Sequence, residues 1–100
     1  MNLESFLTKQ VLWSQDTFGY GRRTKGILDH IKKELVEIEN VPSDLDEWID
    51  VVILALDGAW RTGYQPWEIC DALQKKQKIN MERKWPPIGS EDIANEHIRG

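Results

Sequence analysis

One short stretch of the chain, residues 48–56, limits most strongly how the protein can fold. Eight of its nine residues are apolar, and only Asp50 interrupts them. A helix that is apolar on nearly every side is usually buried, and this stretch is far too short to span a membrane. A chain of 100 residues has little else with which to cover such a helix. We therefore expect a second copy to complete the core, in a homodimer or a homotetramer.

Apolar residues recur at helical spacing in four segments, and no segment alternates cleanly enough for a strand. The predicted helices are one from Leu3 up to the glycine-containing loop 18–21, and three at about 25–39, 43–61 and 66–84. Thr24 and Ser43 are the predicted N-caps, and Gly63 and Pro66 punctuate the last two helices. The sequence predicts an all-α bundle of about four helices, in one domain over residues 1–100.

Composition narrows the class of protein. The net charge is −4, whereas proteins that bind a nucleic acid polymer are usually basic. Cys70 is the single cysteine, so neither an internal disulfide nor a cysteine metal site can form. The first residues show no basic segment followed by an apolar run. We expect a cytoplasmic protein without a membrane segment.

Two pairs of carboxylates stand on consecutive predicted helices: Glu34 with Glu37, and Glu47 with Asp50. Residues three apart lie on the same face of a helix, and a short connection turns the two helices antiparallel. Four carboxylates can then converge. Their oxygens suit a hard cation such as Mg²⁺ or Mn²⁺.

Asp50 carries most of this argument because it lies within the apolar stretch. We expect it to be buried, and a buried carboxylate needs a compensating cation. The alternative for Glu34 and Glu37 is a solvated helix face paired with Lys33 and its neighbours.

Other side chains are candidates for contacts with a ligand. Lys76, Asn80 and Arg83 share one face of the fourth predicted helix and could hold phosphate oxygens, although a solvated basic face explains them as well. Trp13 and Phe18 flank the loop 18–21 and could stack a base, or could be ordinary core residues.

Together these residues resemble the MazG-like all-α nucleoside triphosphate pyrophosphohydrolases, whose hallmark is E-x-x-E followed by E-x-x-D on consecutive helices. Similarity to the phage and bacterial dATP/dGTP diphosphohydrolase branch covers roughly Trp13 to Arg99. The matching stretches are Trp13-Ser14, Thr17-Phe18-Gly19, Arg23-Thr24, Leu28-Asp29-His30-Ile31, Glu47 to Trp60, Lys76 to Pro86 and Glu96-His97-Ile98-Arg99.

The resemblance implies that a purine deoxynucleoside triphosphate, dGTP or dATP, is cut to its monophosphate and pyrophosphate. The implied ligands of two or three Mg²⁺ ions are Glu34, Glu37, Glu47 and Asp50, and either Glu37 or Glu34 is the general base. The implied substrate contacts are Lys33, Lys76 and Arg83 near the phosphates, and Asn80, His30, Trp13 and Phe18 near the sugar or base. It also implies assembly as a dimer or a dimer of dimers.

Three questions stay open at this level. The same chemistry could act on a pyrimidine or a damaged nucleotide. The chain could instead be a non-enzymatic helical interaction module whose tryptophans dock a partner. The role of such an enzyme, lowering a purine pool or supplying a modified-purine pathway, is equally open.

Overall fold

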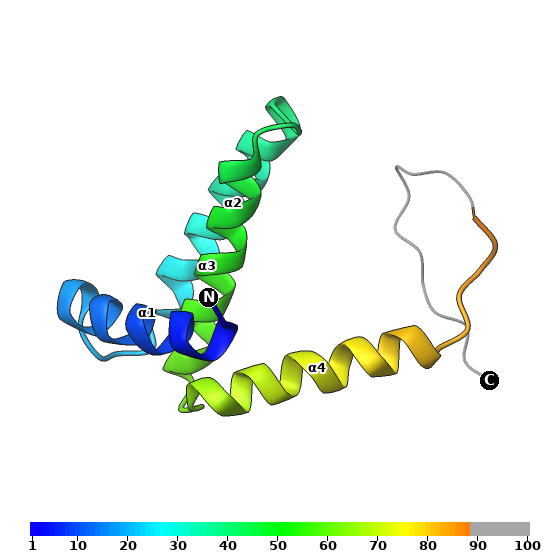
Figure 1. Cartoon of the computed structure of the whole chain (residues 1–100). Helices are drawn as coiled ribbons and strands as arrows, with labels where there is room; N and C mark the ends of the chain where they lie inside the picture. Colours follow the sequence, from blue (N-terminus) through cyan, green and yellow to red (C-terminus); the bar gives the residue numbers. More distant parts are fainter. Residues whose placement is uncertain (89–100) are drawn as a thin grey trace. The chain divides into compact units, whose positions relative to one another are not determined.

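The computed structural model describes residues 1–88 as four α-helices, with no strand among these residues. The helices are α1 (Leu3–Phe18), α2 (Thr24–Asn40), α3 (Leu45–Arg61) and α4 (Pro66–Glu82), labelled in Figure 1. The all-α prediction is confirmed. The chain divides into two compact units, Met1–Cys70 and Asp71–Gly100, and α4 begins in the first and continues into the second. The predicted family stretch Glu96-His97-Ile98-Arg99 lies outside the described residues.

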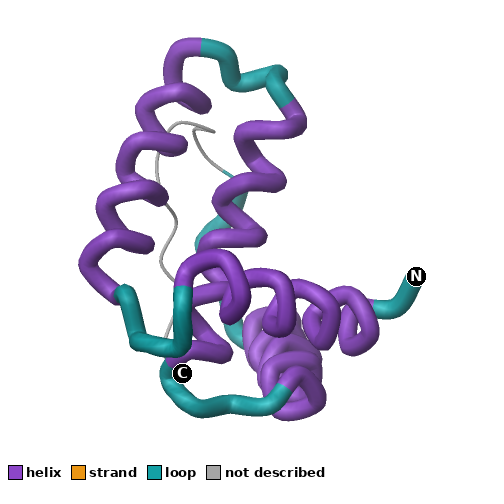
Figure 2. The backbone as a smooth tube through the Cα atoms, turned by 90° about the vertical axis from the view of Figure 1, so that its left-hand side faces the viewer, coloured by secondary structure: helices purple, strands orange, loops and turns teal. Residues whose placement is uncertain are grey.

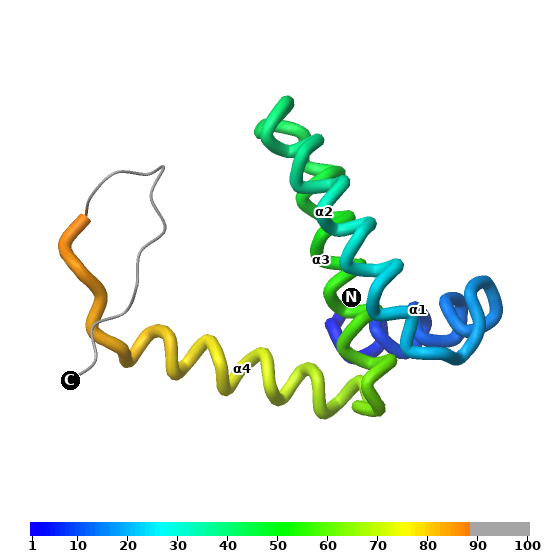
Figure 3. The backbone as a smooth tube through the Cα atoms, turned by 180° about the vertical axis from the view of Figure 1, so that it is seen from behind, coloured from blue at the N-terminus to red at the C-terminus, as the bar shows by residue number. Residues whose placement is uncertain are grey.

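Helices α2 and α3 form an antiparallel hairpin joined by the short turn at residues 41–44, seen from two sides in Figures 1 and 3. Gly58 of α3 lies against Ile27 of α2: a Cβ built on Gly58 would stand 3.7 Å from Cγ2 of Ile27, an ordinary van der Waals distance. The hairpin therefore sets the two carboxylate-bearing helices side by side.

Helix α1 packs on α3 toward the end of the hairpin away from the 41–44 turn, as Figure 2 shows. The apolar core of this first unit is small. Its buried apolar side chains are Leu7, Ile27, Ile38 and Trp60. So few buried apolar residues leave much apolar surface on the outside of the single chain.

The apolar stretch of α3 is the clearest example of that surface. Trp48, Ile49 and Val52 are 50%, 44% and 52% exposed. This exposure agrees with the expectation that the single chain cannot cover the apolar stretch, because only α2 and α1 of the described helices pack against α3. No helix among residues 1–88 is long and apolar enough to cross a membrane.

The helix ends agree with the sequence patterns in part. Gly63 has a φ of 112° after α3, and Pro66 opens α4, both as predicted. The N-cap of α3 is Asp44, whose carboxylate accepts a hydrogen bond from the Asp46 amide at 3.1 Å, and so the prediction of Ser43 was wrong. Thr24 is the first residue of α2, and the N-cap position belongs to Arg23 in the left-handed conformation.

Candidate functional site

Three carboxylates meet across the α2–α3 hairpin. Glu34 and Glu37 come from α2 and Glu47 from α3, and each offers an oxygen within 4.8 Å of the others. The spacing of three places Glu34 and Glu37 on one face of α2, and the hairpin turns that face toward α3. Glu34 is buried with 6% exposure, so the alternative of a fully solvated glutamate face is wrong for this residue.

The electrostatics of this cluster are unbalanced. One oxygen each of Glu34 and Glu47 is buried without a hydrogen-bond partner. The pKa of Glu47 is raised to about 8. The largest cause is a hydrogen bond between a protonated Glu47 and the Glu34 carboxyl group, followed by one to the Glu37 carboxyl group. Burial and the negative charges of Glu34 and Glu37 act in the same direction. As ionised groups, the three carboxylates repel one another, and the two buried oxygens lack a donor.

A divalent cation would relieve both defects. It would supply positive charge and take up the buried oxygens as ligands, and three converging oxygen atoms suit a hard ion. The residues present therefore fit the predicted metal centre, and Glu34, Glu37 and Glu47 could hold a metal ion.

Asp50 requires a correction. It is exposed in the single chain, not buried as its apolar neighbours suggest, and it stands outside the group of three converging carboxylates. The reason is that its flanking apolar residues are themselves exposed on α3. Asp50 instead lines a pocket that α1, α2 and α3 enclose next to the carboxylates.

That pocket has a volume of about 280 Å³, close to the lower end of the range usual for small-molecule sites. Its lining mixes aromatic, aliphatic and polar side chains from all three helices and from the loop between α1 and α2. The lining residues are Gln10, Trp13, Ser14, Phe18, Arg23, Gly26, Ile27, His30, Asp50, Ile53, Leu54 and Asp57.

One wall of the pocket is aromatic. The rings of Trp13 and Phe18 meet edge to face with their centroids 5.6 Å apart, and the guanidinium of Arg23 lies 4.5 Å from the Phe18 centroid. Trp13 and Phe18 are 58% and 47% exposed. They are therefore not ordinary core residues, and the pocket gives them a surface to present to a ligand.

The other predicted contact residues of α2 differ from each other. His30 lines the pocket, and its Nε2 lies 3.2 Å from Oε1 of Glu34, so it links the pocket to the carboxylate cluster. Lys33 is exposed and lies outside the pocket lining.

Three further predicted residues, Lys76, Asn80 and Arg83, belong to the second unit. Arg83 directly follows the end of α4, and its Nη1 donates to Oδ1 of Asn80 at 3.3 Å, so these two side chains lie together. The Asn80 carbonyl accepts a hydrogen bond from the Trp85 indole at 2.7 Å. Their placement near substrate phosphates stays a prediction.

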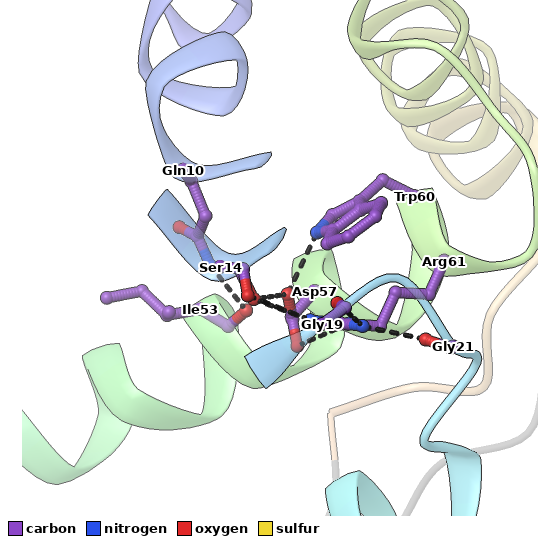
Figure 4. Close-up of polar contacts among 8 residues, drawn as sticks. All are labelled: Gln10, Ser14, Gly19, Gly21, Ile53, Asp57, Trp60 and Arg61. Carbon is purple, nitrogen blue, oxygen red and sulfur yellow. Dashed lines mark hydrogen bonds and ion pairs between the residues drawn. The ribbon is translucent and has the colours of Figure 1, made fainter. Parts of the chain in front are cut away.

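A buried polar cluster at the end of α3, drawn in Figure 4, was not predicted from the sequence. Asp57, Trp60 and Arg61 of α3 bond there with Ser14 of α1, and Ser14 and Asp57 also line the pocket. An acid and an arginine four residues apart at the end of an apolar helix were the available signal.

Comparison with known proteins supports the chemistry of this site. The family model described as dATP/dGTP pyrophosphohydrolase matches residues 6–100, nearly the whole chain. No curated protein and no solved structure matches the chain. Carboxylates that could hold a metal ion, a neighbouring pocket and this match agree with one another: the chain belongs to the dATP/dGTP pyrophosphohydrolase family and is a nucleotide pyrophosphohydrolase.

Proposed function

We propose that this enzyme is Mg²⁺-dependent, with Mn²⁺ as a substitute, and converts dGTP or dATP to the monophosphate and pyrophosphate. The observation that carries the proposal is the cluster of Glu34, Glu37 and Glu47, with two buried oxygens that lack partners. Family membership decides between an enzyme and a non-enzymatic interaction module, in favour of the enzyme.

The carboxylates would hold two or three ions. Bound ions supply charge neutralisation and a hydroxide near neutral pH, so an acidic protein can bind an anionic substrate. Glu34 and Glu47 each contribute a buried oxygen without a hydrogen-bond partner to the cluster. Asp50 lies three residues after Glu47 on α3, at the side where the pocket adjoins the cluster, and we include it as a ligand.

Glu37 is the proposed general base, with Glu34 as the alternative. Glu37 is only partly buried, whereas Glu34 is buried and paired with His30. A base must reach a water molecule and exchange its proton with solvent, and partial exposure serves that role. The proposed base would therefore act from α2, where it would take a proton from the water molecule that attacks the α-phosphorus.

The pocket beside the cluster would bind the sugar and base. Trp13 and Phe18 offer ring faces and edges, and base stacking on aromatic side chains is worth about 1–3 kcal/mol in single-strand binding sites. His30 stands between pocket and carboxylates and would contact the sugar, and Asn80 would contact the sugar or base. Lys33, Lys76 and Arg83 would neutralise phosphate oxygens.

A second copy of the chain would cover the exposed side of α3, in a dimer or a tetramer. The exposed apolar residues Trp48, Ile49 and Val52 form part of one surface on this helix. Light scattering at micromolar concentration should report at least a dimer, and a folded monomer of 11.7 kDa would contradict this.

The deciding experiment is pyrophosphate release from a panel of nucleoside and deoxynucleoside triphosphates with Mg²⁺, with Mn²⁺ and with EDTA. We expect activity on dGTP or dATP that EDTA abolishes. Full activity in EDTA would contradict the metal-dependent mechanism. A tenfold or larger preference in kcat/KM for dCTP, dTTP or dUTP would overturn the purine assignment and leave the metal chemistry intact.

A further inference from the structure

Helix α3 ends in a buried ion pair that the proposed reaction does not use. Nε of Arg61 donates to Oδ2 of Asp57 at 3.1 Å, and the two side chains are 0% and 9% exposed. The other oxygen of Asp57 accepts from the Ser14 hydroxyl at 2.6 Å and from the Trp60 indole at 2.8 Å. Both carboxylate oxygens of Asp57 are therefore occupied.

Every N–H group of the Arg61 guanidinium has a partner. Besides Nε, Nη1 donates to the carbonyls of Gly19 and Gly21 at 2.8 and 2.7 Å. Nη2 donates to the carbonyl and hydroxyl oxygens of Ser14 at 3.3 and 2.9 Å. A guanidinium has five such donors. Because all five are matched within the protein, the guanidinium has no donor left for a ligand.

Two of these five bonds reach the loop between α1 and α2, as Figure 4 shows. This loop adjoins two residues of the pocket wall: Phe18, the last residue of α1, directly precedes Gly19, and Arg23 lies two residues beyond Gly21. The loop backbone is unusual at two points. Gly19 has φ 85° and ψ −176°, and Arg23 has φ 50°. A glycine adopts a positive φ readily, whereas the left-handed conformation of Arg23 is strained and persists only where surrounding contacts enforce it.

We propose that Arg61, oriented by Asp57, is a positioning residue that latches the loop Gly19–Gly21 to α3 and so fixes the Phe18–Arg23 wall for the incoming base. The inference rests on the proposed function. In this proposal the Asp57–Arg61 pair affects how tightly the substrate binds, and it takes no part in the metal-dependent step.

Stability alone does not explain this pair. A buried ion pair can often be replaced by apolar residues of similar volume without loss of stability. An apolar pair, however, has no donors for two loop carbonyls. What the guanidinium adds is the simultaneous placement of α1, the loop and α3 around one planar group.

The test compares three variants in the full chain. Arg61→Lys keeps the charge beside Asp57 but has three donors on a flexible stem, so it cannot reproduce the five bonds. Gly19→Ala strains the loop without touching the ion pair, since a φ of 85° disfavours a side chain even where space is open. Gly21→Ala is the matched control, because its φ is ordinary, its surroundings are open and its carbonyl is retained.

Steady-state kinetics on the preferred purine substrate should separate affinity from chemistry. We expect KM to rise about tenfold or more in Arg61→Lys and Gly19→Ala, with kcat within about threefold of the parent, and Gly21→Ala to stay within about twofold. Unchanged KM in folded Gly19→Ala and Arg61→Lys would overturn the latch, and so would a loss confined to kcat. If Arg61→Lys does not fold, Gly19→Ala decides.

A second readout does not depend on activity. Trypsin cuts after Arg22 and Arg23, which lie between the latched loop Gly19–Gly21 and the start of α2. Mass spectrometry identifies the fragments. Cleavage there should be faster in Arg61→Lys and Gly19→Ala than in Gly21→Ala and the parent chain, and equal rates would refute the latch. A parent chain that releases no pyrophosphate from any nucleotide would instead refute the proposed function, while the cleavage rates still decide the latch.

Discussion

Two clusters of buried charge lie along α3 and differ in how they are balanced. Near its start, Glu47 faces Glu34 and Glu37, three groups of one sign that leave two buried oxygens without partners. At its end, Asp57 and Arg61 form a pair of opposite signs in which each polar atom is bonded. Both clusters are built from residues of neighbouring elements held by the same helix.

The difference separates a site that needs a ligand from one that needs none. Like charges at close range raise the free energy of the folded chain until a cation or a proton arrives. The opposite pair is complete when the chain folds, and removing either partner leaves an uncompensated buried charge. Substitutions in the two clusters should therefore act with opposite sign on stability and differently on activity.

The largest effect should be the loss of activity when the carboxylates of the unbalanced cluster are substituted. Glu34→Gln, Glu37→Gln and Glu47→Gln should each lower kcat by roughly a thousandfold or more, because each removes a charged oxygen ligand or the general base. Pyrophosphate release at saturating Mg²⁺ measures this. Asp46→Asn, an exposed change next to Glu47, is the control and should remain active. A Glu47→Gln enzyme within tenfold of the parent would remove the cluster from the mechanism.

The balanced pair should give the largest loss of stability. Arg61→Met leaves Asp57 buried without its cation and should lower the free energy of unfolding by about 3–5 kcal/mol. Urea denaturation followed by tryptophan fluorescence measures the change. The double variant Asp57→Asn with Arg61→Met should recover part of the loss, because the unpaired charge is gone. Equal stability of the single and double variants would contradict this account.

The next largest effect should be the pH dependence of the stability of the metal-free protein, which comes from the carboxylate cluster. The pKa of Glu47 is raised to about 8, mainly by the carboxyl groups of Glu34 and Glu37, so between its ordinary value and 8 the folded chain holds a proton that the unfolded chain has lost. Stability is therefore fully present below the ordinary pKa and is lost as the pH rises toward 8. The Tm in EDTA should fall from pH 5 to pH 8, and Glu47→Gln should flatten that fall. A Tm that rises over this range in the parent would contradict the assignment.

The smallest effect concerns Asp50 in the metal-free protein. Because Asp50 is exposed, Asp50→Asn should change the free energy of unfolding by less than about 0.5 kcal/mol. If Asp50 were buried, as its apolar neighbours suggest, Asp50→Asn would instead raise the Tm, because it would remove an uncompensated buried charge. The same variant should still lose activity with Mg²⁺ if Asp50 joins the ions beside the pocket. An active Asp50→Asn enzyme would leave Glu34, Glu37 and Glu47 as the ligands.

Local patterns predicted the helices and the carboxylate cluster because both depend on residues close in the chain. Spacing placed Glu34 and Glu37 on one face, and the short turn after α2 brought Glu47 to them. The burial of Asp50 depended on what covers α3, and periodicity does not state how many sides a helix buries. Helical spacing reaches only one partner of Arg61, Asp57. The other partners, Ser14, Gly19 and Gly21, are 40 to 47 residues away in the chain.

Because α3 is one continuous helix, its two charged clusters lie on the same side of the helix axis. Glu47, Asp50, Asp57 and Arg61 follow one another at intervals of three, seven and four residues. At about 100° per residue these positions fall within about 80° around the helix. One residue inserted between Asp50 and Asp57 would turn the latch by about 100° against the carboxylates. Evolution can therefore vary the composition of this segment more freely than its length.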